Sequence, residues 1–268
     1  MISVSLVTYL TPEDEFRSCL SALASARVGR IYVVDNASEK RIADVCAEYD
    51  KVEYIANENT GYGAAHNIAI RKSMAAGYPY HLVLNTDMVF DPSLVDRMLD
   101  YADRHPDIGM MHPRMLYPDG RVQYTCRRIP TPANVFFRRF FPPVARILDR
   151  KYLLKKELGD KPADVPYIQG SFMLLRREAL EDVGLFDERF FMYAEDIDLS
   201  RRMHESWRTV YYPAVTAVHA HRAASYHSLR MLRVHIVNMC RYFNKWGWLF
   251  DADRRRLNRK IERQNTES

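Results

Sequence analysis

Several short apolar runs of this 268-residue sequence are followed directly by polar side chains. The clearest case is Asp87, which is separated from the apolar run 81–84 only by Asn85 and Thr86. A carboxylate at the end of a buried strand is costly unless it binds something, and a divalent metal held against a phosphate-bearing substrate is one such partner. Taken alone, Asp87 could equally be a turn residue that caps the next segment.

The same pattern recurs along the N-terminal half. The expected strands end at Thr8, at Asp35, at Asn57 or Asn59, and just before Asp87. In an open α/β sheet the carboxyl ends of parallel strands share one edge, so these side chains are expected to meet in one site. Such an edge suits a nucleotide: it offers acceptors for base and ribose, a helix N-terminus, and an acid for a metal.

A second group of acids lies in the third quarter of the chain. Glu195 and Asp196 open a predicted helix that also contains Asp198, and the aromatic run 190–193 precedes them. The helix dipole alone would account for one or two acids at a helix N-terminus. Burial beside the aromatic run would also raise the carboxyl pKa, and general-base catalysis near neutral pH would become possible.

A later strand, 215–218, leads into His219 and His221. The two histidines are two apart on an extended segment, and we expect only one of them to reach Asp87. Either is a competent metal ligand.

The elements that must position these residues alternate between strand and helix. Thr11 is expected to cap the first helix, with Pro12 at its first position. The loop around Gly61 lacks both GxGxxG and GK[ST], which argues against a dinucleotide enzyme or an ATPase. The alternation predicts a mostly parallel sheet with right-handed crossovers. Strands are expected near 2–9, 30–35, 52–56 and 81–84, and helices near 12–24, 42–49 and 61–76.

Composition narrows the class of protein further. The net charge of +5 permits attraction to anionic substrates or membranes, and the basic residues form no recognisable nucleic-acid motif. Four cysteines without ligand spacing indicate reduced thiols. With no signal peptide and no apolar run long enough to cross a bilayer, we expect a cytoplasmic protein.

Two segments carry basic and aromatic residues together. The insertion at about 126–162 is predicted to lie over the site, either as an ordinary lid or as an amphipathic surface that contacts an anionic membrane. The C-terminal extension 226–268 is predicted to be helical and carries the basic run 254–256. It is expected to contact a membrane surface or a partner, which could be a second copy in a homodimer, or else to be a solvated helix.

The order of the motifs resembles glycosyltransferase family 2, and within it the bacterial rhamnosyltransferase-like branch that builds cell-surface polysaccharides. The resemblance covers about residues 2–225. Its motifs are VDNAS (34–38), NTGYGAAHN (59–67), LNTD (84–87), GSFMLLRR (170–177), GLFDE (184–188), FMYAEDIDL (191–199) and VH (218–219).

The resemblance implies a GT-A fold, a three-layer α/β/α sandwich with a mixed, mostly parallel sheet and here a C-terminal helical extension. Residues 1–225 would form one glycosyltransferase domain, with a nucleotide-sugar half (1–112) and an acceptor half (113–225). It also implies an inverting, metal-dependent transfer from a nucleotide sugar. The best match for the donor is dTDP-L-rhamnose, with a UDP-hexose or UDP-N-acetylhexosamine as the alternative. The acceptor would be a glycan or a polyprenyl-diphosphate-linked glycan.

The resemblance also implies roles for individual residues. Asp87 would bind Mg²⁺ or Mn²⁺ together with His219, with His221 as the alternative ligand. Asp196 would be the general base, and Glu195 would support it. The donor would be contacted by Thr8, Tyr9, Asp35, Asn59, Gly61, Asn67, Asn85 and Thr86.

Two other readings remain open. A nucleotidyltransferase also sets acids at strand ends, but it needs a glycine-rich basic loop near the N-terminus, which the segment 5–11 does not provide. The second alternative is a non-catalytic binding or scaffold protein of the same fold. The feature in its favour is Asn85, which stands where the family's metal-binding motif often has its first aspartate.

Overall fold

The computed structural model describes residues 1–25, 27–155, 157–219 and 229–264. Its strands are β1 (Ile2–Thr8), β2 (Val28–Asp35), β3 (Val52–Ala56), β4 (Tyr80–Leu84), β5 (Met88–Phe90), β6 (Ile108–Leu116), β7 (Cys126–Arg127), β8 (Ala163–Asp164), β9 (Tyr167–Ile168), β10 (Phe172–Arg176) and β11 (Arg208–His219). Its helices are α1 (Glu13–Ala22), α2 (Lys40–Cys46), α3 (Tyr62–Ala75), α4 (Ser93–Asp103), α5 (Pro132–Phe140), α6 (Pro142–Tyr152), α7 (Arg177–Val183), α8 (Glu195–Ser206), α10 (Leu229–Trp246) and α11 (Ala252–Gln264).

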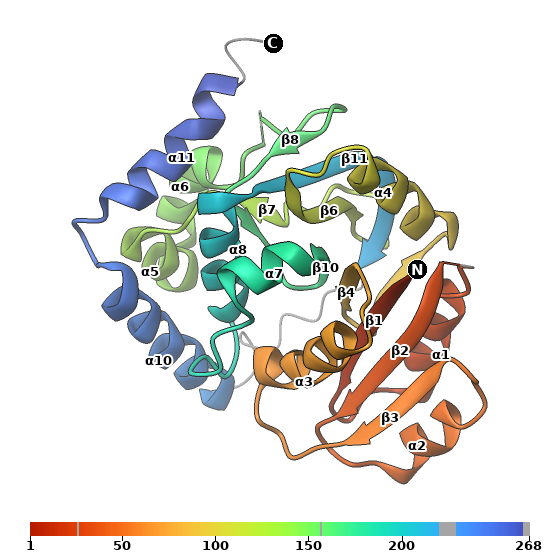
Figure 1. The fold of residues 1–268 in the computed structure, drawn as a ribbon. Coiled ribbons are helices and arrows are strands. Elements are labelled where there is room, and N and C mark those ends of the chain that lie inside the picture. Colours follow the sequence, from red (N-terminus) through yellow and green to blue (C-terminus); the bar gives the residue numbers. More distant parts are fainter. Residues whose placement is uncertain (26, 156, 220–228, 265–268) are drawn as a thin grey trace.

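Nine of the described strands form one mixed sheet (Figure 1). Along the sheet the order is β3-β2-β1-β4-β10-β6-β11-β5, and β8 pairs with β11. The first four strands are parallel, as the alternation of strands and helices predicts. β10 is antiparallel to both of its neighbours, β4 and β6, and so joins the two halves of the chain in one hydrogen-bonded ladder.

Helices cover both faces of this sheet. Successive side chains of a strand point to opposite faces, so Leu82 and Leu84 pack into one core while Val83 packs into the other. The first core is closed by α1, α2 and α4, and the second by α3, α7 and α8. The molecule is therefore the three-layer α/β/α sandwich that the sequence predicts.

The C-terminal helices pack onto the sandwich through a third apolar cluster, which joins α8 to α10 and α11. Beside it, Arg201 of α8 makes two hydrogen bonds of 2.7 and 2.8 Å to Asp251, and both side chains are buried. In Figure 1, α10 and α11 lie along one side of the molecule, next to α5 and α6. The extension is thus fixed to α8 rather than solvated as a free helix.

Three local predictions need correction. Thr11 does not cap α1, because its hydroxyl accepts a bond from the backbone of Tyr9 instead. The C-terminal segment is two helices, separated at Gly247, where φ is +103°. Arg254 is buried and bonds to the carbonyls of residues 248 and 249, so it is not part of a surface cluster of cations.

All four cysteines are free thiols. Within the described part of the chain, no helix is both long and apolar enough to cross a membrane.

Candidate active site

Strand pairing brings Asp87 and His219 together. β5 begins at the residue after Asp87 and runs antiparallel to the end of β11, where His219 stands opposite Met88. His219 Nε2 consequently lies 3.3 Å from Asp87 Oδ1. The imidazole is almost fully buried, and the carboxylate is about one-seventh exposed, at 14%. His221 lies outside the described residues.

The second ring nitrogen of His219 faces Gln123. Nδ1 lies 3.1 Å from Gln123 Oε1, an atom that can only accept a hydrogen bond, so Nδ1 carries the hydrogen in the neutral ring. Nε2 is then left with its lone pair toward Asp87. This is the arrangement in which a histidine binds a metal while its other nitrogen is held by a second group.

These two side chains fit a divalent metal that also takes ligands from a substrate. In the described part of the chain, no group of three or more His, Cys, Asp or Glu side chains could hold a metal by itself. Mg²⁺ and similar ions are commonly bound by one or two protein groups together with substrate phosphates. Asp87 and His219 suit that second kind of site.

A second set of acids lies at the start of α8. Asp196 is buried, and its Oδ2 accepts hydrogen bonds from the backbone of Gly170 (3.0 Å) and the hydroxyl of Tyr167 (3.2 Å). Its Oδ1 lies 2.8 Å from its neighbouring backbone N–H at Ile197. Gly170 precedes β10, whose antiparallel pairing puts its first residues at the carboxyl end of β4. The sheet therefore brings Asp196 to the same edge as Asp87.

Burial changes the acidity of both carboxyls. It raises the pKa of Asp196 to about 6, although the hydrogen bonds from Gly170, Ile197 and Tyr167 oppose the change. Burial, and then the charge of Asp196, raise the pKa of Glu195 to about 8. At neutral pH, Asp196 is therefore mostly ionised and Glu195 mostly protonated. Both acids are therefore buried with raised pKa values, as expected from the sequence.

Tyr62, the first residue of α3, links the two sets. Its hydroxyl lies 2.8 Å from Asn85 Oδ1 and 2.7 Å from the carbonyl oxygen of Gly170. Burial raises its pKa well above the usual value, and the charges of Glu195, Asp196 and Asp87 raise it further. The tyrosine is thus a neutral hydroxyl placed among all three acids.

Two of the residues expected to touch the donor are closed to it in this structure. Asp35 is fully buried, and its carboxylate accepts four hydrogen bonds: from Thr8, Tyr54 and the backbone of Ala37 and Glu39. These bonds fill its acceptor sites, so neither it nor Thr8 presents a polar atom to a ligand. Asp35 instead shapes the loop that follows β2. Tyr9, the next residue after β1, is about half exposed at 52%.

Asn67 is also closed to a donor. It is fully buried and binds both backbone groups of Phe186 and the carboxylate of Glu188, which ties α3 to the loop before α8. Gly61 also lets α3 approach the loop before α8. Its φ of +101° and its close approach to Phe191, whose carbonyl oxygen would clash with an added Cβ, both require glycine.

The remaining candidates, Asn59, Thr86 and Asn85, differ in exposure, and Thr86 is buried. Asn59 is exposed. The hydroxyl of Thr86 donates to Glu15 at 3.1 Å. Asn85 is partly exposed and is held through its side-chain oxygen by Tyr62.

Three residues of the site do not follow from sequence reasoning: Gln123, Tyr62 and Tyr167. Each acts through a partner that lies far away in the chain. Tyr62 belongs to a motif that the sequence singles out, but nothing in the motif itself indicates a bond to Asn85 or Gly170. Only the antiparallel insertion of β10 brings these partners within reach.

Comparison with known proteins finds matches over most of the chain. Residues 3–184, more than half of the chain, match the family model described as glycosyl transferase family 2. An N-acetylglucosaminyl-diphospho-decaprenol L-rhamnosyltransferase of Mycobacterium tuberculosis is 32% identical over 244 residues, which are 84% of this chain and 77% of that protein. The rhamnosyltransferase WbbL of Escherichia coli K12 is 28% identical over 240 residues, covering 86% and 88% of the two chains.

Solved structures show the same architecture at much lower identity. The crystal structure of GalNAc-T7 with UDP, GalNAc and Mn²⁺ superposes with a TM-score of 0.62 and 14% identity. The match covers 82% of this chain and 43% of that one.

Proposed function

This chain belongs to glycosyltransferase family 2 and has the GT-A fold, and from that premise we propose an inverting transfer of L-rhamnose from dTDP-L-rhamnose to a lipid-linked glycan in polysaccharide synthesis. The observation that carries the mechanism is that two acids from different segments of the chain lie close to one tyrosine. Asp87 lies with His219 at the end of β4, while Asp196 comes from α8, and Tyr62 is close to both.

In this mechanism Asp196 is the general base. It removes the proton of the acceptor hydroxyl, whose oxygen forms a bond to the anomeric carbon as the bond from that carbon to the diphosphate breaks. An inverting displacement requires the attacking oxygen and the leaving group to lie on opposite faces of the sugar. A base that comes from a different segment than Asp87 meets this requirement, and a carboxyl with a pKa of about 6 is mostly ionised at neutral pH.

Asp87 and His219 would hold Mg²⁺ or Mn²⁺. When bound, such an ion stabilises negative charge on a departing diphosphate as a Lewis acid. Gln123 keeps the lone pair of His219 Nε2 directed toward Asp87. Asn85 has its side-chain oxygen engaged by Tyr62, and we therefore assign it to positioning the end of β4 rather than to the metal.

The donor and acceptor are inferred from the relatives. Both curated relatives above are named rhamnosyltransferases, and the mycobacterial one is named for a decaprenyl-diphosphate-linked acceptor. An acceptor of this kind lies in a membrane, so we propose that the protein works as a peripheral protein on the cytoplasmic face of that membrane. Tyr9 and Asn59, which are both exposed and both belong to the expected nucleotide edge, are proposed to contact the donor nucleotide.

A donor panel tests the proposal. Purified protein is assayed with dTDP-L-rhamnose, UDP-glucose and UDP-N-acetylglucosamine, each with Mn²⁺, Mg²⁺ or a chelator, for slow hydrolysis and for transfer to a diphosphate-linked N-acetylglucosamine lipid. We expect metal-dependent turnover of dTDP-L-rhamnose. Turnover of a UDP-sugar instead would overturn the donor assignment. Binding of donors without any turnover would favour a non-catalytic protein of the same fold.

A further inference from the structure

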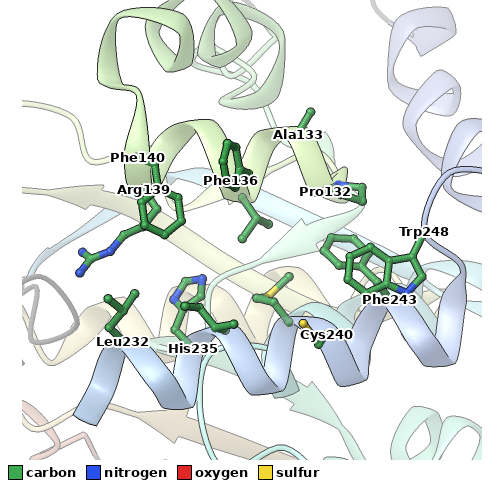
Figure 2. A pocket seen from close by; sticks show the side chains of 13 residues that line it. Pro132, Ala133, Phe136, Arg139, Phe140, Leu232, His235, Cys240, Phe243 and Trp248 are labelled. Atoms are coloured by element: carbon green, nitrogen blue, oxygen red, sulfur yellow. The ribbon is translucent and has the colours of Figure 1, made fainter. Parts of the chain in front are cut away.

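A groove with almost entirely apolar walls separates α5 from α10 (Figure 2). Its volume of about 520 Å³ is within the range of pockets that hold organic ligands. Phe136 and Phe140 of α5 form one wall, and Ile236 and Met239 of α10 form the other. No residue that the site above requires lines this groove, so it needs its own explanation.

The two ends of the groove differ in chemistry. In Figure 2, Arg139 and His235 lie toward one end, while Phe243 and Trp248 close the other. The rings of Phe243 and Trp248 pack with centroids 5.2 Å apart. One end therefore offers a guanidinium and an imidazole, and the other offers only aromatic surface. A ligand that matches both would have an anionic head and a long apolar tail.

The polar end is the one connected to the catalytic acids. The ring of His235 packs against that of Tyr193, two residues before Glu195, with centroids 5.0 Å apart. One turn further along α10, buried Asn238 donates a hydrogen bond of 2.9 Å to the carbonyl of Met192. The same helix thus lines the groove and holds the loop that leads into the acids.

The charge of the two helices suits an anionic head group. Together α5 and α10 carry six Lys or Arg residues and no Asp or Glu. Arg138 and Lys245 are paired with acids of other elements, whereas Arg139 lines the groove itself. Apolar side chains are also unusually exposed on this side. Eleven large apolar side chains are exposed in the segments 136–147 and 229–250, whereas the rest of the described chain has five. Such a patch on a water-soluble surface marks a binding site for protein, lipid or membrane.

We propose that this groove binds the isoprenoid chain of the lipid-linked acceptor, with its diphosphate at the Arg139 end and its sugar directed toward Asp196. The inference rests on the proposed function for the identity of the acceptor. It adds a site for the lipid portion, which makes the length of that lipid a determinant of affinity. The isoprene units next to the diphosphate lie along Phe136, Ile236 and Met239, as far as Trp248.

The test compares two acceptors in detergent micelles: N-acetylglucosamine diphosphate carried on decaprenol and on the much shorter citronellol. We expect the wild-type protein to have a KM for the decaprenyl acceptor about tenfold lower, since a buried chain of this length contributes more than the roughly 1.4 kcal/mol that this ratio represents. Ile236→Glu and Phe136→Glu place a charge in opposite walls. Each should abolish the preference by raising the decaprenyl KM alone, with kcat and the citronellyl KM unchanged.

Val237→Glu is the matched control. Val237 is 40% exposed beside Ile236, at 44%, but it does not line the groove. It should keep the preference for the long chain. The proposal would be overturned if Val237→Glu lost the preference for the long chain as fully as the groove variants do. It would also be overturned if both groove variants kept that preference. A further outcome would also overturn it: the groove variants lose vesicle binding or self-association but keep the preference for the long chain in micelles. The groove would then bind a membrane or a second copy of the protein.

A binding measurement separates this inference from the proposed function. Farnesyl diphosphate should raise the Tm of the wild-type protein, while inorganic diphosphate should not, and Ile236→Glu should remove the difference. Equal effects of the two probes would contradict the groove assignment. If no nucleotide sugar is ever turned over but farnesyl diphosphate still stabilises the wild type selectively, the proposed function fails and the lipid site stands.

Discussion

Tyr62 donates its single hydroxyl hydrogen to a choice of two acceptors, Asn85 Oδ1 at 2.8 Å and the carbonyl of Gly170 at 2.7 Å. Asn85 belongs to the segment that ends in Asp87, and Gly170 binds Asp196 through its N–H. One hydroxyl therefore spans the metal-binding segment and the segment that holds the base. The relative position of the two acids depends on this contact as well as on the sheet.

Asp196→Asn should lower kcat by about 10²–10⁴-fold, because the amide cannot take the proton of the acceptor hydroxyl. The side chains have similar shape, so binding of dTDP, measured by calorimetry, should stay within about twofold of wild type. Glu195→Gln is the matched control. Since Glu195 is mostly protonated at neutral pH, its amide should retain most of the activity. The opposite ranking of the two variants would exchange the roles proposed for them.

The activity of the wild type should fall in acid. With the pKa of Asp196 at about 6, kcat/KM should drop about tenfold for each pH unit below that value, because the base becomes protonated. The test is a pH profile for transfer, with donor hydrolysis and protein stability followed in parallel. A flat profile down to about pH 5 would exclude Asp196 as the base.

The stability of the fold should fall as the pH rises, whereas the activity should fall in acid. Glu195 has a higher pKa in the folded protein than in the unfolded chain, so the folded state binds its proton more tightly. The associated stability is present below the unfolded pKa and is lost as the pH rises through about 8. Glu195→Gln removes this titration. Its Tm relative to wild type should rise between about pH 4.5 and pH 8 and then level off, and a constant difference across that range would contradict the prediction.

Gln123→Leu should weaken Mn²⁺ binding about 10–100-fold, because His219 loses the acceptor that orients its ring. The affinity is measured by titrating Mn²⁺ in the presence of dTDP. Gln123→Glu keeps an acceptor for the Nδ1 hydrogen and should bind the metal nearly as well as wild type. Equal affinity in Gln123→Leu would show that the orientation of His219 is set elsewhere.

Asp251→Ala should destabilise the protein by about 3–5 kcal/mol, because it leaves the buried guanidinium of Arg201 without its partner. Urea unfolding gives the value. Asp253→Ala removes a carboxylate from the exposed pair with Arg256 and should cost less than about 1 kcal/mol. Similar losses in both variants would mean that the C-terminal helices are not held through Arg201.

The sequence pattern predicts which residues lie at the edge of the sheet, but not which hydrogen bonds they make there. Apolar runs that end in polar residues locate Asp87 and His219 correctly, since a buried strand has to end where polar groups begin. The pattern could not distinguish Asp35, whose carboxylate is filled by the chain's own donors, from an acid left open to a ligand. That distinction depends on Tyr54, which comes from the neighbouring strand.

The basic C-terminal run shows a similar limit. A run of three arginines is most simply interpreted as a surface cluster. After the break at Gly247, however, the chain brings Arg254 back onto the carbonyls of residues 248 and 249. Burial then lowers the pKa of Arg254. Which arginine of such a run faces inward follows from the packing of α11, and the sequence alone does not reveal it.

The position of β10 has a mechanical consequence. Because its backbone is hydrogen-bonded to β4 on one side and β6 on the other, no hinge crosses the sheet between the halves that supply Asp87 and Asp196. Opening a cleft between those halves would break a continuous ladder of hydrogen bonds. We therefore expect the rate of product release to respond to changes in the loops at the strand ends rather than to changes in the sheet.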